Sequence, residues 1–541
     1  MQQGYSTAAD TFRGLFARRR HNAQTTAGKL PFELLARIFR LCASNDLVDP
    51  WPSPGEKVLV SAITISHVSL RWRVYALETC ELWSQLRSAL GPRWLEEMLV
   101  RAHSTPLSLF LEDDCSCPET MQTQMDHLLS HLRHISLHGS PTIRRPQLQS
   151  FVRLLSAPTP MLESLEIIHT FEGYTAVFVP VEPFAGGAPN LRRLVVDGDR
   201  IVLPGRVQVM ENLTYYEFRD RGTNGYASNE QLRVMLEHMP NLQVLILERS
   251  WTYELEFLPT TKPRLSLQYL TDFSIRGAGS YLACVLSQLK ISPTTNVKVT
   301  CIRAIEKDKD RLCAVLRTVV EDWSGNATSL AARVAFCRHS NTPAADYDVW
   351  ELKRCYSEGG CGDAAWASTQ EQTRFEVHTL ARYNVLKNIL LSSVLTPCGL
   401  RALAMYCSDD DRGHRPKWQT LFTGCGTVEH LCIAAPDWLG RLLREWRTDG
   451  SLFRNLKTLW IRGVDLTSSI DVPGPVVHRA PEQWTPKMVL ERLIAQQGSA
   501  FPLDALCFVD SAVPGGWFKE LSRVVAVRLV EGDSQIPSYL Q

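Results

Sequence analysis

A short apolar pattern recurs along this chain and restricts the folds open to it more than any other feature. The pattern is apolar-x-x-apolar-x-apolar, and its copies begin at Leu132, Leu162, Leu191, Leu213, Leu242, Leu270, Val428, Leu456, Leu503 and Val524. Most neighbouring copies start 28 to 30 residues apart. A recurrence of this kind predicts a repeating structural unit that contains one short strand.

The segments between the copies have helical periodicity. In the segment before Leu242, the apolar residues Leu232, Met235, Leu236 and Met239 fall on one helical face. Pro240-Asn241 then ends the helix ahead of the next strand. The predicted unit is therefore helix, turn and strand, and it buries its apolar face only by stacking on its neighbours.

These units resemble the leucine-rich repeats. The resemblance implies an α/β leucine-rich-repeat-like solenoid over residues 91–541, used to recognise a target. Between residues 301 and 426, helical and strand-like stretches alternate irregularly. The solenoid either continues there or is interrupted by an insertion at about 338–375, and both alternatives stay open.

A different pattern occupies residues 28–90. Pro31 suits the first position of a helix, and Glu33 suits its first turn. The apolar residues that follow form one broad stripe, namely Leu30, Leu34, Leu35, Ile38, Phe39, Leu41 and Cys42. After a proline-rich loop at 45–57, residues 58–86 indicate one or two more helices, which makes a small three-helix unit.

The stretches LPFELLARIF, SHVSLRWR and ELW, in this order, resemble the F-box domain, in the version abundant in fungi. Two positions depart from the family pattern: Ser69 stands where cysteine is usual, and Cys80 stands where proline is usual. The resemblance implies binding to a Skp-type adaptor and, through it, to a cullin–RING ubiquitin ligase. It places this contact on Leu30, Pro31, Leu34, Leu35, Ile38 and Phe39, and leaves Trp72 and Trp83 to hold the domain together.

In the repeat pattern, the positions between the leucines face the opposite side of the strand. The resulting candidates for target binding are Arg192, Arg193, Gln243, Lys457 and Trp460. An exposed aromatic side chain often contributes much of a binding energy, which makes Trp460 the strongest of them. An equally weighted alternative is that a C-terminal loop covers Trp460.

Composition limits the remaining functions. With 58 Lys and Arg against 57 Asp and Glu, the chain has no overall charge that would attract nucleic acid. No apolar stretch reaches the roughly 18 residues needed to span a membrane. The 15 scattered cysteines and the polar start predict a reducing compartment, cytoplasmic or nuclear. Residues 1–27 are expected to be a disordered tail, and the basic run at 18–21 to be a solvated turn or a weak nuclear-import signal.

No catalytic, metal-binding or cofactor-binding residue is nominated. The chain has no phosphate-binding glycine loop and no nucleophile or zinc-protease motif. The short cluster Cys115-Ser116-Cys117 lacks a second pair at metal-ligand spacing. We therefore expect an α+β adaptor, not an enzyme. The alternatives are a leucine-rich-repeat scaffold or ligand-binding protein with no ubiquitin role, and a thiol-dependent enzyme.

Overall fold

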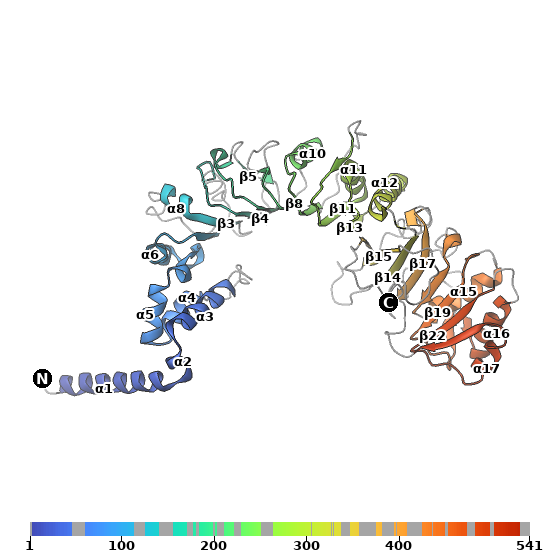
Figure 1. Cartoon of the computed structure of the whole chain (residues 1–541). Helices are drawn as coiled ribbons and strands as arrows, with labels where there is room; N and C mark the ends of the chain where they lie inside the picture. The colour runs from blue at the N-terminus through green and yellow to red at the C-terminus, as the bar shows by residue number, and fades with distance from the viewer. Residues whose placement is uncertain are drawn as a thin grey trace. The chain divides into compact units, whose positions relative to one another are not determined.

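The computed structural model divides into two compact units, Met1–Met239 and Pro240–Gln541 (Figure 1). It describes residues 3–45, 60–112, 125–139, 155–169, 177–179, 183–198, 201–202, 210–220, 229–249, 263–303, 306–325, 327, 329–336, 347–355, 375–380, 394–395, 398–407, 425–434, 436–448, 453–472, 482–497 and 502–530.

The first unit begins with helices. They are α1 (Gln3–Gln24), α2 (Thr26–Lys29), α3 (Phe32–Asn45), α4 (Ser61–Ser66), α5 (Leu70–Glu78), the 3-10 turns η1 (Cys80–Trp83) and η2 (Ser88–Leu90), and α6 (Pro92–Ala102). Gly91 has φ of +84°, a conformation that glycine tolerates, and Pro92 follows at the start of α6. Further along are α8 (Met125–His131), η3 (Pro183–Gly186) and α10 (Asn229–Glu237).

The sheet of the first unit is parallel and follows the chain order. Its strands are β1 (Gln85–Arg87), β2 (Leu107–Glu112), β3 (Leu132–Gly139), β4 (Ser164–His169), β6 (Arg193–Gly198) and β8 (Tyr215–Asp220). Each strand pairs with the next one in this series. The short strands β5 (Val177–Phe178) and β7 (Ile201–Val202) form a separate parallel pair.

The sheet of the second unit is mainly parallel and contains one antiparallel segment. Its strands, in order of pairing, are β9 (Val244–Arg249), β11 (Asp272–Ala278), β13 (Asn296–Arg303), β16 (Phe375–Leu380), β15 (Tyr347–Cys355), β14 (Ser329–Phe336), β17 (Leu400–Cys407), β18 (His430–Ile433), β19 (Thr458–Arg462), β22 (Ala505–Val509) and β23 (Ala526–Val530). Only β15 runs antiparallel to its two neighbours.

The remaining elements of the second unit accompany this sheet. Two small ladders join β10 (Leu265–Ser266) to β12 (Leu289–Lys290) and β20 (Ile470–Val472) to β21 (Glu482–Trp484). The helices are α11 (Gly279–Gln288), α12 (Glu306–Ser324), α15 (Pro436–Thr448), α16 (Pro486–Gln497) and α17 (Trp517–Leu521), with the 3-10 turn η6 (Cys425–Thr427).

The apolar positions of the recurring pattern form the core. In the copy at 456–461, the side chains of Leu456, Leu459 and Ile461 are all buried. Trp323 of α12 is also buried, and its indole Nε1 donates a 3.1 Å hydrogen bond to the carbonyl oxygen of Thr295. The pattern therefore predicted the strands correctly: every copy has a parallel strand beginning within three residues of its second apolar position.

The predicted fold class was nevertheless wrong. The class is α/β, a large parallel sheet with mixed helices, and no solenoid is detected in the described parts of the chain. Among the described residues, the helices between consecutive strands are unequal, from 5 residues in α17 to 19 in α12, and β15 breaks the parallel order. The N-terminal region is also not a clear three-helix module, because α1, α2, α6 and the 3-10 turns accompany α3, α4 and α5.

Two other expectations concern particular segments. Residues 1–27 were expected to be a disordered tail, but the structure places helix α1 at Gln3–Gln24 and α2 after it. The proposed insertion at 338–375 contains β15, the antiparallel strand, while residues 337–346 and 356–374 lie outside the described part. Cys115-Ser116-Cys117 also lies outside it.

Candidate functional site

Helix α3 has two apolar faces, and the first of them forms the local core. Leu35 and Phe39 are completely buried on this face. The ring of Phe39 packs on that of Trp72 in α5, with centroids 5.2 Å apart. Trp83 is buried beside them and donates a 2.7 Å hydrogen bond from Nε1 to the carbonyl oxygen of Ala76. These contacts hold α3 and α5 together.

The second apolar face of α3 is open to solvent. Leu34, Ile38 and Leu41 expose 47%, 36% and 60% of their surface. Their spacing of four and then three residues places them in one line along the helix, which we call the α3 stripe. A contiguous exposed apolar surface of this kind is typical of a protein interaction site.

Helix α5 repeats this arrangement. Leu70, Val74 and Leu77 have the same spacing and expose between 38% and 52% of their surface. We call this line the α5 stripe. The helix begins at Ser69, whose hydroxyl oxygen accepts a 3.2 Å hydrogen bond from the backbone N–H of Trp72. Ser69 therefore serves as the N-cap of α5.

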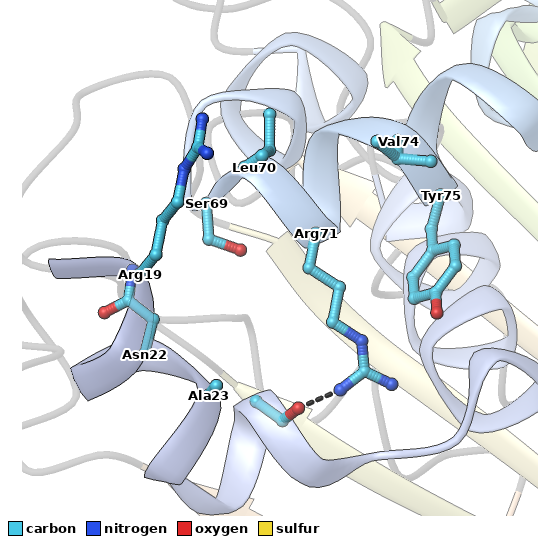
Figure 2. A pocket seen from close by; sticks show the side chains of 9 residues that line it. Arg19, Asn22, Ala23, Ser69, Leu70, Arg71, Val74 and Tyr75 are labelled. Carbon is cyan, nitrogen blue, oxygen red and sulfur yellow. Dashed lines mark hydrogen bonds between the residues drawn. The ribbon is translucent and has the colours of Figure 1, made fainter. Parts of the chain in front are cut away.

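Arg71 fixes the entry into α3. Its guanidinium donates a hydrogen bond to the carbonyl oxygen of Gly28 (Figure 2). It donates a second one, of 2.6 Å, to the carbonyl oxygen of Leu30. The same group lies 5.3 Å from the centroid of the Tyr75 ring, and this ring packs against Phe32. Charge-assisted hydrogen bonds to carbonyl groups are stronger than neutral ones, so this arginine anchors the chain before α3 onto α5.

A pocket of about 340 Å³ opens between the end of α1, the α2 segment and α5 (Figure 2). The residues that line it are Arg19, Asn22, Ala23, Gly28, Ser69, Leu70, Arg71, Val74 and Tyr75. We call this cavity the α1–α5 pocket. It joins the α5 stripe, because Leu70 and Val74 belong to both.

The structure separates the predicted adaptor-binding residues into two groups. Leu34 and Ile38 are exposed, Pro31 is exposed and Leu30 is half-buried, so all four can reach a partner. Leu35 and Phe39 are buried against the local core, and the prediction that they bind an adaptor directly was wrong.

Sequence reasoning missed Leu41, Leu70, Val74 and Leu77 as exposed surface. For Leu41, the signal was its three-residue distance from Ile38. For the α5 stripe, the signal was that this segment has more apolar residues than the small core can bury.

The predicted target-binding residues do not form one cluster. Arg192 and Arg193 belong to the first unit, and Gln243, Lys457 and Trp460 to the second. Arg192 is exposed and donates to the carbonyl oxygens of Pro189 and Asn212, while Gln243 is exposed at the start of β9.

Lys457 and Trp460 lie in different environments. The Lys457 ammonium is 2.6 Å from Glu429 Oε2, at the start of the strands, where Arg401 lies 3.5 Å from the same carboxylate. Trp460 is 5% exposed and packs in a core cluster of small apolar side chains. The expectation that it is an exposed hot spot was wrong. The neighbouring strands carry small side chains at these positions, which leave room for the indole ring: Ala404, Cys432 and Cys507.

A network of charged side chains lies on β6 and β8 of the first unit. Arg219 Nε is 2.6 Å from Glu217 Oε1, and the hydroxyl of Tyr215 donates a 2.5 Å hydrogen bond to Glu217 Oε2. The Arg193 guanidinium stacks on the Tyr215 ring at 3.8 Å. Burial, with a further contribution from the hydrogen bond to Glu217, raises the pKa of Tyr215. These contacts hold the polar side chains of β6 and β8 in fixed positions on the sheet.

Two histidines on β3 are neutral near pH 7. Burial, followed by the charge of Arg193, lowers the pKa of His134 to about 4. Burial also lowers the pKa of His138, opposed by the carboxylate of Asp197. These side chains therefore contribute no positive charge to the sheet at neutral pH.

Two more features bear on chemistry: possible metal ligands and the cysteine thiols of the second unit. No group of three or more His, Cys, Asp and Glu side chains among them could hold a metal ion. Burial raises the pKa of the Cys301 thiol to about 12, and those of Cys313 and Cys398 to about 11. Thiols of this kind stay protonated at neutral pH and are weak nucleophiles.

Two further findings concern membrane-spanning helices and the similarity of the chain to known proteins. Within the described ranges, no helix has both the length and the apolar character to cross a membrane. No protein-family model matches the chain, and no curated protein matches it.

Proposed function

We propose that the chain is a substrate-recognition adaptor of an SCF-type cullin–RING ubiquitin ligase. The α3 stripe would bind a Skp-type adaptor, and the sheets would hold a target protein. The observation that carries the proposal is the division of α3 into two apolar faces. Leu35 and Phe39 are buried in the local core, whereas Leu34, Ile38 and Leu41 are exposed apolar side chains in the part of the chain that the structure describes.

The spacing of these side chains supports a helix-in-groove contact. An amphipathic helix binds a hydrophobic groove through anchors three and four residues apart, and Leu34, Ile38 and Leu41 have this spacing. The F-box-like stretches noted in the sequence lie on the same helix and on α5. Arg37 and Arg40 are exposed on α3 as well and would form a polar rim around the apolar contact.

The mechanism of such an adaptor is proximity. Holding a target beside a ubiquitin-charged enzyme turns a bimolecular encounter into a local one with a raised effective concentration. No catalytic group of this chain is required for that step. Arg192 and Arg193 of the first unit, and Gln243 and Lys457 of the second, remain candidates for target contact. The cytoplasm and nucleus are the compartments where the adaptor would act.

The test is a calorimetric titration of the full chain with a purified Skp-type adaptor. We expect saturable binding that Leu34→Ala together with Ile38→Ala weakens by about 30-fold or more, since each truncated interface anchor costs about 1–2 kcal/mol. The matched control is Val100→Ala on α6, which removes an apolar side chain that is 68% exposed outside α3. It should bind as the wild type does.

The alternative, a scaffold or ligand-binding protein without a ubiquitin role, predicts a different result. In that case a folded wild-type chain would not bind the adaptor at all, and the proposal would fail.

A further inference from the structure

The α1–α5 pocket combines apolar walls with an unbalanced positive charge. Ala23, Leu70, Val74 and Tyr75 supply the apolar part of its lining. Leu70 and Val74 are large aliphatic side chains that remain about half exposed. At about 340 Å³, the pocket lies at the lower end of the range of ligand-sized cavities, roughly 300–1,000 Å³. It can therefore take one large apolar group.

The charge at its edge comes from two guanidinium groups. Arg19 enters from α1 and Arg71 from α5, and the lining contains no carboxylate (Figure 2). Arg71 is engaged only with the neutral carbonyl oxygens of Gly28 and Leu30 and with the Tyr75 ring, so its charge is not compensated. Within the described residues, neither arginine forms an ion pair with an acidic side chain.

The surroundings increase this imbalance. Arg18 and Arg20 flank Arg19 on α1 and are exposed. Between residues 13 and 32 the sequence contains no aspartate or glutamate, so no acidic side chain of that segment opposes them. The segment from residue 13 to residue 32 therefore carries a net positive charge, although the whole chain is close to neutral.

We propose that the α1–α5 pocket binds an acidic peptide segment of a partner protein. A leucine-like side chain of that segment enters the pocket against Leu70 and Val74, and a neighbouring carboxylate pairs with Arg19. The guanidinium fork suits a carboxylate because it can donate two parallel hydrogen bonds to it. The apolar walls favour a peptide with aliphatic residues over a purely polar anion.

This site does not depend on the α3 stripe. It adds a second binding surface to the N-terminal helices, and its ligand carries a negative charge that the adaptor-binding proposal does not require. A failure of one proposal therefore leaves the other standing, and the variants below leave the α3 stripe intact.

The test uses the full chain and a short fluorescein-labelled peptide of alternating Asp and Leu residues, followed by fluorescence anisotropy. We expect saturable binding that weakens as salt is raised, because the contact is partly ionic. Arg19→Glu should weaken it by about tenfold or more, because charge reversal replaces an attraction to the peptide carboxylate by a like-charge repulsion. The matched control is Arg18→Glu, an identical charge change on the neighbouring residue outside the lining, which should change affinity by less than about threefold.

A second pair of variants tests the apolar half of the site. Leu70→Ser removes a wall of the pocket and should weaken binding, whereas Leu77→Ser changes an exposed leucine of the same helix that does not line it. A peptide with Asn in place of each Asp should bind at least about tenfold more weakly, because it cannot form the ion pair.

Three results with the peptide would overturn the proposal. They are absence of saturable binding to the Asp-Leu peptide, equal losses for Arg19→Glu and Arg18→Glu, and equal losses for Leu70→Ser and Leu77→Ser. Binding to phosphatidylserine vesicles that the peptide does not displace would also overturn it, because it would assign the basic surface to a lipid headgroup.

Discussion

Arg71 Nη2 lies 2.6 Å from the carbonyl oxygen of Leu30, a residue 41 positions earlier in the chain. This hydrogen bond connects α5 to the residue that precedes α3. It holds the start of α3 in place while Phe39 and Trp72 pack further along. The exposed stripes of both helices are thereby fixed to one local core.

Replacement of Arg71 should loosen this connection. Arg71→Ala removes both charge-assisted hydrogen bonds and the contact with Tyr75, which should cost about 2 kcal/mol of local stability. Hydrogen exchange of the backbone amides of α3 measures this loss directly. Arg73→Ala, on the exposed side of α5, is the control and should change protection by less than about 0.5 kcal/mol. Equal effects of the two variants would contradict the anchoring role of Arg71.

Truncation of two neighbouring residues of α3 should lower stability by very different amounts. Phe39→Ala leaves a cavity against Trp72 and should lower the local free energy of unfolding by about 3–5 kcal/mol. Ile38→Ala removes an exposed side chain and should cost less than about 1 kcal/mol. Denaturation followed by the fluorescence of the tryptophans, or hydrogen exchange of α3, distinguishes the two. A large loss for Ile38→Ala would mean that this residue is needed for folding.

Gly28 occupies a position where no side chain fits. A Cβ atom there would clash with the carbonyl oxygen of Asn22, so Gly28→Ala must displace the backbone of α2 and should cost about 1–3 kcal/mol. Gly14, within α1, has open space at the same point. Gly14→Ala should therefore stabilise α1 by up to about 1 kcal/mol, because alanine favours a helix over glycine. Amide exchange in residues 13–29 reports both effects.

The stability of the first unit should depend on pH through His134. Its pKa falls from 6.5 to about 4 on folding, so the unfolded chain binds a proton in this window and the folded chain does not. Stability is therefore full above pH 6.5 and declines as the pH is lowered towards 4. His134→Gln should make the decline shallower in amide exchange of β3. A slope unchanged by this variant would contradict the burial of a neutral imidazole.

The sequence predicted the strands well because each copy of the pattern buries its own leucines. Leu162, Leu191 and Leu242 all lie in the core just before a parallel strand. The overall architecture was harder to predict, since a local pattern does not specify how unequal units assemble. The stretch that forms β15 was strand-like in the sequence but has no copy of the pattern, and only its pairing with β14 and β16 shows that it runs antiparallel.

The candidate site was predicted in part. Helical periodicity identifies the apolar residues of α3, but it does not tell which of two adjacent faces is covered. Trp72 selects Phe39 as its neighbour and leaves Ile38 outside, and that choice comes from tertiary packing. The prediction that Trp460 is exposed was wrong because small residues on adjacent strands create the space that buries it. The α1–α5 pocket depends on α1, a helix that the polar N-terminal sequence did not indicate.

The most direct test of the central claim is the affinity of the full chain for a purified Skp-type adaptor, measured for the wild type and for Leu34→Ala with Ile38→Ala. Circular dichroism establishes that both proteins are folded. We predict saturable wild-type binding that the variant loses, while Val100→Ala retains it. Absence of binding by the folded wild type, or equal binding by the variant, would contradict the role assigned to the α3 stripe.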